Sequence, residues 1–220
     1  MFVGHLAVAL TGRKASRSTS LVWFVVAANL VDLIWPLFLL AGLERVRIDP
    51  GNTAFTPLAF ESYPWTHSLL MGIVWGIALA ALARWRGVSR TGAWLVAGLV
   101  VSHWVLDFIT HRPDLPLWPW PDGTYGLGLW RSIPATFAIE GLLWVLGIVL
   151  FLSARRPRGV RGRIAFWSFV LVSTLMWAAS PFSPPPPDER TLEMFSLVGW
   201  IIVPWASWIE RTSEARRSKL

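Results

Sequence analysis

The sequence predicts an all-α integral membrane protein with about six transmembrane helices, a short N-terminal half-helix and both termini in the cytoplasm. Three observations support this prediction. Hydrophobic residues make up 54% of the 220 residues and charged residues only 15%, whereas a soluble domain carries about 25% charged residues. The charged residues lie mostly between long apolar runs. The basic residues gather in every second segment between those runs, which is the pattern that sets the orientation of a membrane protein.

Six apolar runs are long enough, or nearly so, to cross about 30 Å of hydrocarbon as helices. We place them at residues 19–43, 65–83, 92–111, 132–152, 163–180 and 192–209. An earlier apolar stretch, residues 2–10, is too short to span and predicts a half-helix that re-enters from the cytoplasmic side, where protein or a wet cavity must surround it. Its basic residues follow the stretch instead of preceding it, so we expect no cleaved signal peptide.

The distribution of charge predicts the topology. Fifteen of the 20 Lys and Arg residues, with only two acids among them, lie in four segments: 11–18, 84–91, 153–163 and 210–220. The other five basic residues and eight acids lie in the three segments that alternate with these: 44–64, 112–131 and 181–193. By the positive-inside rule the basic segments are cytoplasmic. The net charge of +7 is therefore explained by basic residues that set the orientation in the membrane. We expect no nucleic-acid partner.

We expect a single polytopic membrane domain, residues 1–220, because the sequence shows neither an internal repeat nor a separate soluble region. The polar residues deep inside the apolar runs are confined to residues 1–152. We therefore expect residues 153–220 to form two helices that serve only for packing, followed by a basic tail. Residues 112–131 are rich in Pro, Gly and Trp and predict a structured cap over the outer end of the third run. The sequence does not indicate an oligomeric state.

Three ionisable residues recur every four positions at the end of the third run: His103, Asp107 and His111. On an α-helix this spacing keeps them on one face. Ionisable groups inside a membrane are costly and are functional candidates by default. Further polar groups of compatible depth come from the half-helix and from the first, second and fourth runs: His5, Asp32, His67 and Glu140.

These residue types are suited to a divalent metal. A carboxylate buried in hydrocarbon would protonate unless a cation accompanies it. The chain has no cysteine, so a metal would need His and carboxylate ligands, which suit Zn²⁺ first and also Mn²⁺ or Fe²⁺. His103 and His111 are about 12 Å apart along a helix, so the bidentate units are His103–Asp107 or Asp107–His111, and a two-metal site could use both pairs. The candidate ligands are His5, Asp32, His67, His103, Asp107 and His111.

Several neighbours complete the candidate site. Asn29, Thr66 and Thr110 are expected to support the ligands or to pack beside them. Arg112 and Asp114 follow the third run and could form a surface ion pair. Alternatively, Arg112 could hold a phosphate or carboxylate of a substrate.

The order of these residues resembles a known family. The elements are His5, Asp32, the pair Thr66-His67 and the H-x3-D-x2-TH stretch from His103 to His111. Together they are similar to the small bacterial inner-membrane proteins known as membrane-bound metal-dependent hydrolases, over about residues 1–145. Many members carry a second Asp two residues after the first, where this chain has Ile34, and a His and Arg shortly before the TH pair, where it reads ESYPW. The resemblance implies a metal hydrolase of the inner membrane but fixes neither the metal number nor the substrate.

The first functional hypothesis is therefore a membrane-embedded hydrolase of an ester, phosphoester or amide bond in a lipid or lipid-linked substrate. A bound metal would activate water and polarise the scissile group. Glu140 is the candidate general base, and Asp107 the second candidate catalytic residue. The alternatives are a transporter that uses intramembrane His, Asp and Glu for ion or proton coupling, and a non-catalytic scaffold in which these groups only join helices.

Overall fold

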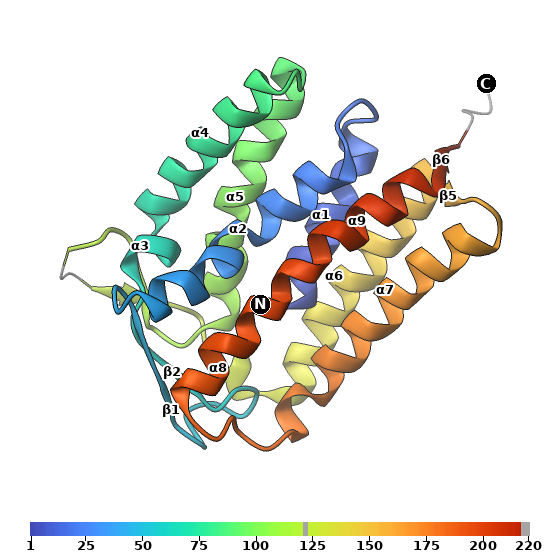
Figure 1. Ribbon diagram of the computed structural model, residues 1–220. Helices are drawn as coiled ribbons and strands as arrows, with labels where there is room; N and C mark the ends of the chain where they lie inside the picture. The colour runs from blue at the N-terminus through green and yellow to red at the C-terminus, as the bar shows by residue number, and fades with distance from the viewer. Residues whose placement is uncertain (121–122, 217–220) are drawn as a thin grey trace.

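The computed structural model describes residues 1–120 and 123–216 and consists mainly of long helices (Figure 1). The α-helices are α1 (Val3–Ala15), α2 (Leu21–Leu40), α3 (Pro64–His67), α4 (Leu69–Trp85), α5 (Arg90–Thr110), α6 (Ile133–Ala154), α7 (Gly159–Ala179), α8 (Glu189–Ser196) and α9 (Ile202–Arg211). Three short 3₁₀ segments are η1 (Leu129–Arg131), η2 (Ser180–Phe182) and η3 (Leu197–Ile201). Three antiparallel strand pairs join β1 (Arg45–Ile48) to β2 (Leu58–Ser62), β3 (Leu115–Pro116) to β4 (Thr124–Tyr125), and β5 (Arg155–Pro157) to β6 (Ser213–Ala215).

The prediction of an all-α integral membrane protein is confirmed. Among the described residues, five helical segments are long and apolar enough to cross a membrane: Leu21–Leu40, Arg90–Thr110, Ile133–Ala154, Gly159–Phe182 and Glu189–Arg211. The apolar helix α4 is shorter. Serine side chains cap the N-termini of α2, α4, α5 and α6 by accepting a backbone N–H of the first turn, which satisfies donors that a helix start leaves free.

Two of the predicted runs differ in detail from the helices observed. The run predicted at 65–83 does not begin as one helix, because Ser68 has extended backbone (φ −76°, ψ 148°) and separates the four-residue helix α3 from α4. The Ser68 hydroxyl then caps α4 by accepting from Met71 N. The last run starts earlier than predicted and is not uniform, since the 3₁₀ segment η3 lies between α8 and α9.

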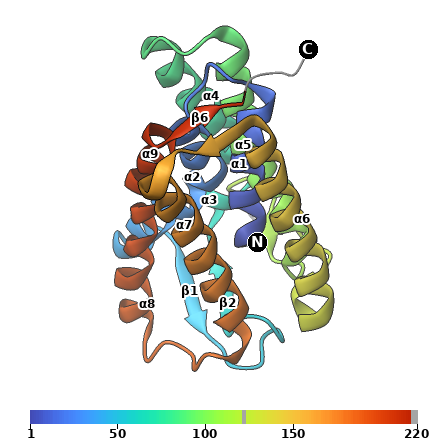
Figure 2. The same cartoon turned by 90° about the vertical axis from the view of Figure 1, so that its right-hand side faces the viewer.

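The alternating loops gather at opposite ends of the molecule. The turn between α4 and α5, the strands β5 and β6 and the C-terminal end of α1 lie at one end, and the hairpin β1–β2 lies at the other (Figures 1 and 2). The basic segments thus share one end, as the predicted topology requires. Which end faces the cytoplasm stays a prediction.

The N-terminal half-helix is present and is longer than predicted. α1 extends to Ala15 instead of ending near residue 10, and its last turn contains Arg13 and Lys14. The N-terminus lies midway between the two ends of the molecule in both views (Figures 1 and 2). α1 packs mainly against α6 and α2, and most of its residues are buried. Protein therefore surrounds a helix that begins at mid-depth.

A close approach between helices holds α1 in place. Gly147 of α6 lies so near Ala7 that an added Cβ would be 2.7 Å from both Cα and the carbonyl oxygen of Ala7. These are backbone atoms, so a larger residue at position 147 would push α1 away from α6. Small residues commonly allow such contact between membrane helices.

We therefore expect Gly147→Ala to destabilise the protein by about 1–3 kcal/mol, the usual cost of overpacking. The matched control is Gly98→Ala in α5, where an added Cβ meets nothing within 4 Å. Alanine has the better helix propensity, by about 1 kcal/mol, so the control should be neutral or stabilising. Thermal unfolding of both variants in detergent checks this, and equal stability would contradict the close packing.

The predicted cap over the end of α5 is present in the part of residues 112–131 that the structure describes. Leu127 N donates to the carbonyl oxygen of Phe108, and Gly128 N donates to that of His111. Leu115, a residue of the strand pair β3–β4 in this segment, is fully buried. The cap fixes the chain immediately after α5, where the candidate site lies.

Candidate metal centre

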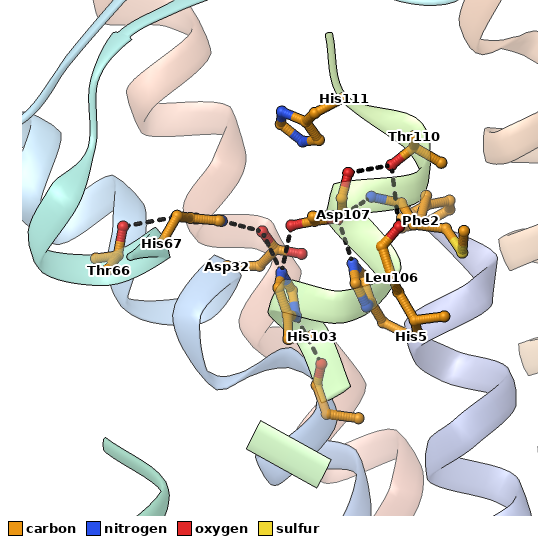
Figure 3. Close-up of polar contacts among 12 residues, drawn as sticks. Phe2, His5, Asp32, Thr66, His67, His103, Leu106, Asp107, Thr110 and His111 are labelled. Atoms are coloured by element: carbon orange, nitrogen blue, oxygen red, sulfur yellow. Dashed lines mark hydrogen bonds and ion pairs between the residues drawn. The ribbon is translucent and has the colours of Figure 1, made fainter. Parts of the chain in front are cut away.

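Five of the predicted ligands converge on the centre of the molecule. They come from α1, α2, α3 and α5: His5, Asp32, His67, His103 and Asp107 (Figure 3). Among the described residues, two groups of three have possible ligand atoms within 4.8 Å of one another: His5–His103–Asp107 and Asp32–His67–His103. His103 belongs to both groups. The helical spacing on α5 explains one pairing directly, because residues four apart share a face.

The hydrogen bonds of His103 define what its second nitrogen can do. Nδ1 lies 2.8 Å from the carbonyl oxygen of Ala28, which can only accept, so Nδ1 carries a hydrogen. Nε2 lies 3.1 Å from Asp107 Oδ2 and 3.6 Å from Asp32 Oδ1, without a well-aligned hydrogen bond. A buried lone pair facing two carboxylates is repulsive, so a proton or a metal ion must lie there. This donor set suits a divalent metal.

Asp107 connects the site to the N-terminal half-helix. Its Oδ1 accepts a hydrogen bond from the Met1 amine and lies 3.0 Å from His5 Nε2. The imidazole rings of His5 and His103 are stacked, with centroids 3.6 Å apart and planes 6° from parallel. The half-helix thus brings His5 to Asp107, its hydrogen-bonding partner.

His67 approaches from the opposite side of Asp32. Its Nε2 lies 3.3 Å from Asp32 Oδ1, and its Nδ1 lies 2.7 Å from Thr66 Oγ1. The side chain of Asp32 is 45% exposed, whereas those of His67 and His103 are 5% and 1% exposed. Asp32 is therefore the exposed member of this group.

His111 lies outside both groups of possible ligands. The predicted ligand set, which included His111, is therefore corrected at this residue. α5 ends at Thr110, and His111 has extended backbone (φ −65°, ψ 149°). This backbone turn directs the imidazole away from the helix face, and the predicted Asp107–His111 pair does not form (Figure 3). His111 Nδ1 instead lies 3.0 Å from Asp114 Oδ1 and 3.3 Å from the Tyr63 hydroxyl.

The neighbouring polar residues take simpler roles. Arg112 Nε lies 3.2 Å from Asp114 Oδ2, so the expected ion pair is present. Asn29 donates to the carbonyl oxygen of Val25, one turn earlier in α2. The Thr110 hydroxyl faces carbonyl oxygens of its own helix, at 3.3 and 3.4 Å. Thr66, by contrast, contacts a candidate ligand directly.

Glu140 of α6 lies beside the start of α1, outside both groups. Its Oε2 accepts a hydrogen bond from Phe2 N at 3.1 Å, while Oε1 is buried without a hydrogen-bond partner among the described residues. Because Met1 N bonds to Asp107, Glu140 and Asp107 bind consecutive backbone nitrogens. The fourth run thus brings its carboxylate next to the ligand cluster, as predicted from depth.

Two residues of the site were not predicted. Glu44, in the loop after α2, is 2% exposed and bonds to Thr66. Burial raises the pKa of Glu44, while His67 and the hydrogen bonds donated by Thr66 and Trp65 act to lower it. Tyr63 donates to Asp114 at 2.8 Å, and both burial and the Asp114 charge raise its pKa well above the usual value. Neither belongs to a spaced motif, so no sequence signal identified them.

Comparison with known proteins gives one result. A family model described as "YdjM inner membrane protein" matches residues 1–182. All of the candidate ligands and Glu140 lie within the matched residues. No curated protein and no solved structure gives a match.

Proposed function

The chain belongs to the YdjM inner membrane protein family, and we propose that it is a membrane-embedded metal-dependent hydrolase. One observation carries the proposal: His103 Nε2, buried, faces the carboxylates of both Asp107 and Asp32. A divalent cation would neutralise those carboxylates and use that lone pair.

The ligand set that we propose is Asp32, His67 and His103, with Asp107 beside the same nitrogen of His103. His103 has one nitrogen available, because the other donates to Ala28. The two groups therefore cannot both be complete three-ligand sites at once. We favour the set of Asp32, His67 and His103 because a catalytic metal needs an open coordination position. Asp32 is the exposed side chain among these ligands. A second ion would have only His5 and Asp107 from its group. We propose Zn²⁺ first, with Mn²⁺ or Fe²⁺ as alternatives.

When bound, such an ion supplies Lewis acidity, which activates water and polarises the bond to be cleaved. The chain's own residues would do the rest. Asp107, held by His5 and the Met1 amine, orients His103. Glu140 is the proposed general base, because its Oε1 has no hydrogen-bond partner among the described residues and can accept a proton, and because Glu140 and Asp107 bind consecutive nitrogens of the N-terminal backbone.

The substrate that we propose is a lipid or lipid-linked molecule with an ester, phosphoester or amide bond. Asp32 belongs to α2, one of the segments able to cross a membrane. A substrate that reaches the exposed carboxylate of Asp32 must therefore place its scissile bond below the membrane surface. Lipids do this without leaving the bilayer.

The proposed base leads to an activity prediction. In detergent or liposomes loaded with Zn²⁺, Mn²⁺ or Fe²⁺, we expect cleavage of members of a panel of ester, phosphoester and amide lipids, and loss of cleavage with a chelator. Glu140→Gln keeps an oxygen that can accept from Phe2 N but loses the base, so the rate should fall about 100-fold or more. Glu193→Gln, at a carboxylate 3.3 Å from Arg190 in α8, is the control. Full activity of Glu140→Gln would remove Glu140 from this role.

A transporter is the second candidate, favoured by a specific observation. The Met1 amine, Asp107, His103, Asp32 and His67 form an unbroken series of ionisable groups, each within 3.6 Å of the next. Such a series could conduct protons. Flux of protons or metal ions into proteoliposomes, without cleavage of any lipid in the panel, would favour this function over hydrolysis.

A further inference from the structure

Within the part of the chain that the structure describes, Glu44 makes three hydrogen bonds, and all three donors belong to the segment that carries His67. Its Oε1 accepts from the backbone N–H groups of Trp65 and Thr66, each at 2.8 Å. Its Oε2 accepts from the Thr66 hydroxyl, also at 2.8 Å. Glu44 is 2% exposed, so these bonds form in a site from which water is excluded. A carboxylate accepts at both oxygens and donates at neither.

The direction of these bonds fixes the hydrogen on His67. Thr66 has a single hydroxyl hydrogen, and it is donated to Glu44. Thr66 Oγ1 can therefore only accept from His67 Nδ1, which lies 2.7 Å away. His67 then carries a hydrogen on Nδ1, and Nε2 is the nitrogen that faces Asp32, 3.3 Å away. This is the tautomer that can bind a metal through Nε2.

We infer that Glu44 is a positioning residue that sets the tautomer of His67 through Thr66. The inference rests on the proposed metal-binding function of His67, and it adds a carboxylate–hydroxyl–imidazole relay that begins outside the ligand cluster. Carboxylates behind metal-binding histidines orient the ring in this way, and their loss typically weakens metal binding about 10–100-fold. Here one hydroxyl separates the carboxylate from the imidazole.

Glutamine at position 44 has nearly the same shape as glutamate, but it would reverse the direction of the hydrogen bonds that run through Thr66 to His67. The two backbone N–H groups require an oxygen, so the amide oxygen must take the place of Oε1. The amide NH₂ then takes the place of Oε2 and donates to Thr66 Oγ1. The Thr66 hydroxyl can no longer donate to position 44 and would donate to His67 Nδ1 instead. His67 would move its hydrogen to Nε2 and lose the lone pair that faces Asp32.

The experiment combines two measurements on Glu44→Gln. In ¹⁵N-histidine-labelled, metal-free protein, NMR reports which nitrogen of His67 is protonated; the chain has four histidines, and a His67→Gln spectrum assigns the signals. We expect a hydrogen on Nδ1 in the wild type, and a hydrogen on Nε2 with none on Nδ1 in Glu44→Gln. Titration with Zn²⁺ should then show about 10–100-fold weaker binding by Glu44→Gln. The matched control is Glu61→Gln, at an exposed carboxylate 2.9 Å from Arg47, which should match the wild type in both measurements.

Threonine variants keep the inference testable if Glu44→Gln does not fold. Thr66→Ser retains the hydroxyl and should keep wild-type Zn²⁺ affinity, whereas Thr66→Val removes it and should weaken binding to a similar extent as Glu44→Gln. A wild-type His67 without a hydrogen on Nδ1 would overturn the inference, as would unchanged Zn²⁺ affinity in Glu44→Gln or Thr66→Val. Failure of the proposed function looks different: the wild type would bind no metal, while the NMR comparison would still show whether Glu44 sets the tautomer.

Discussion

His103→Gln is expected to abolish metal binding, whereas His111→Gln is expected to leave it unchanged. His103 is shared by both groups of candidate ligands, and its Nε2 is the atom that faces two carboxylates. The wild-type protein should contain near-stoichiometric Zn, Mn or Fe, and the variant essentially none. Loss of a residue behind a ligand costs about 10–100-fold in affinity, and loss of a ligand itself should cost more.

The measurement is elemental analysis of detergent-purified protein, with His111→Gln as the matched control. The two histidines lie eight residues apart in one segment, but only His103 points into the ligand cluster. The double variant His103→Ala/Asp107→Ala should also lack metal while remaining folded. Metal retained by folded His103→Gln would show that the ligand set is wrong. A wild type that stays metal-free after reconstitution with each ion would remove the hydrolase proposal, and transport or helix packing would become the better explanation.

The part of the site within one helix could be predicted from the sequence. His103 and Asp107 lie four residues apart in α5, so helical geometry alone places their side chains together. The arrival of Asp32 and Glu140 at compatible depth followed from the rise per residue. Each of these predictions required only that an apolar run be a straight helix, which composition indicates well.

The ends of helices limited the rest of the prediction. His111 continues the four-residue spacing in the sequence, but α5 stops one residue earlier and the side chain turns away. Ser68 similarly separates the helix that carries His67 from α4. Helix boundaries depend on capping and on contacts of the following loop, which local patterns describe poorly. The run at 65–83 therefore looked like one helix beginning with Trp65.

Glu44 could not be predicted, for a different reason. It is one of three acids in the segment 44–64, and nothing in the local sequence distinguishes it from Asp49 or Glu61. Its role arises because the chain returns through the hairpin β1–β2 and brings Thr66 against it. Contacts that depend on such a return of the chain are visible only in three dimensions.

Arg13 was counted among the basic residues that set topology, and its surroundings give it a second role. The side chain is 3% exposed. Its guanidinium donates to the carbonyl oxygens of Ser16 and Arg17 at 3.1 Å and to that of Thr19, and it lies 3.3 Å from Glu210 of α9. One residue thus joins the end of α1, the loop that follows it and the last helix. α1 also carries His5, so Arg13 anchors the helix that supports Asp107.

We therefore expect Arg13→Met to destabilise the protein by about 3 kcal/mol or more, because it leaves buried carbonyl oxygens without their donor and removes one of the two arginines that face Glu210. For a chain of this size, that loss lowers the unfolding temperature by about 6–12 °C. Arg17→Met is the control, because Arg17 is exposed in the same loop and carries the same charge. Thermal unfolding in detergent measures both variants. If Arg13→Met were as stable as Arg17→Met, the interactions of Arg13 would add nothing beyond its charge, and the position of α1 would depend on its packing against its neighbouring helices, mainly α6 and α2.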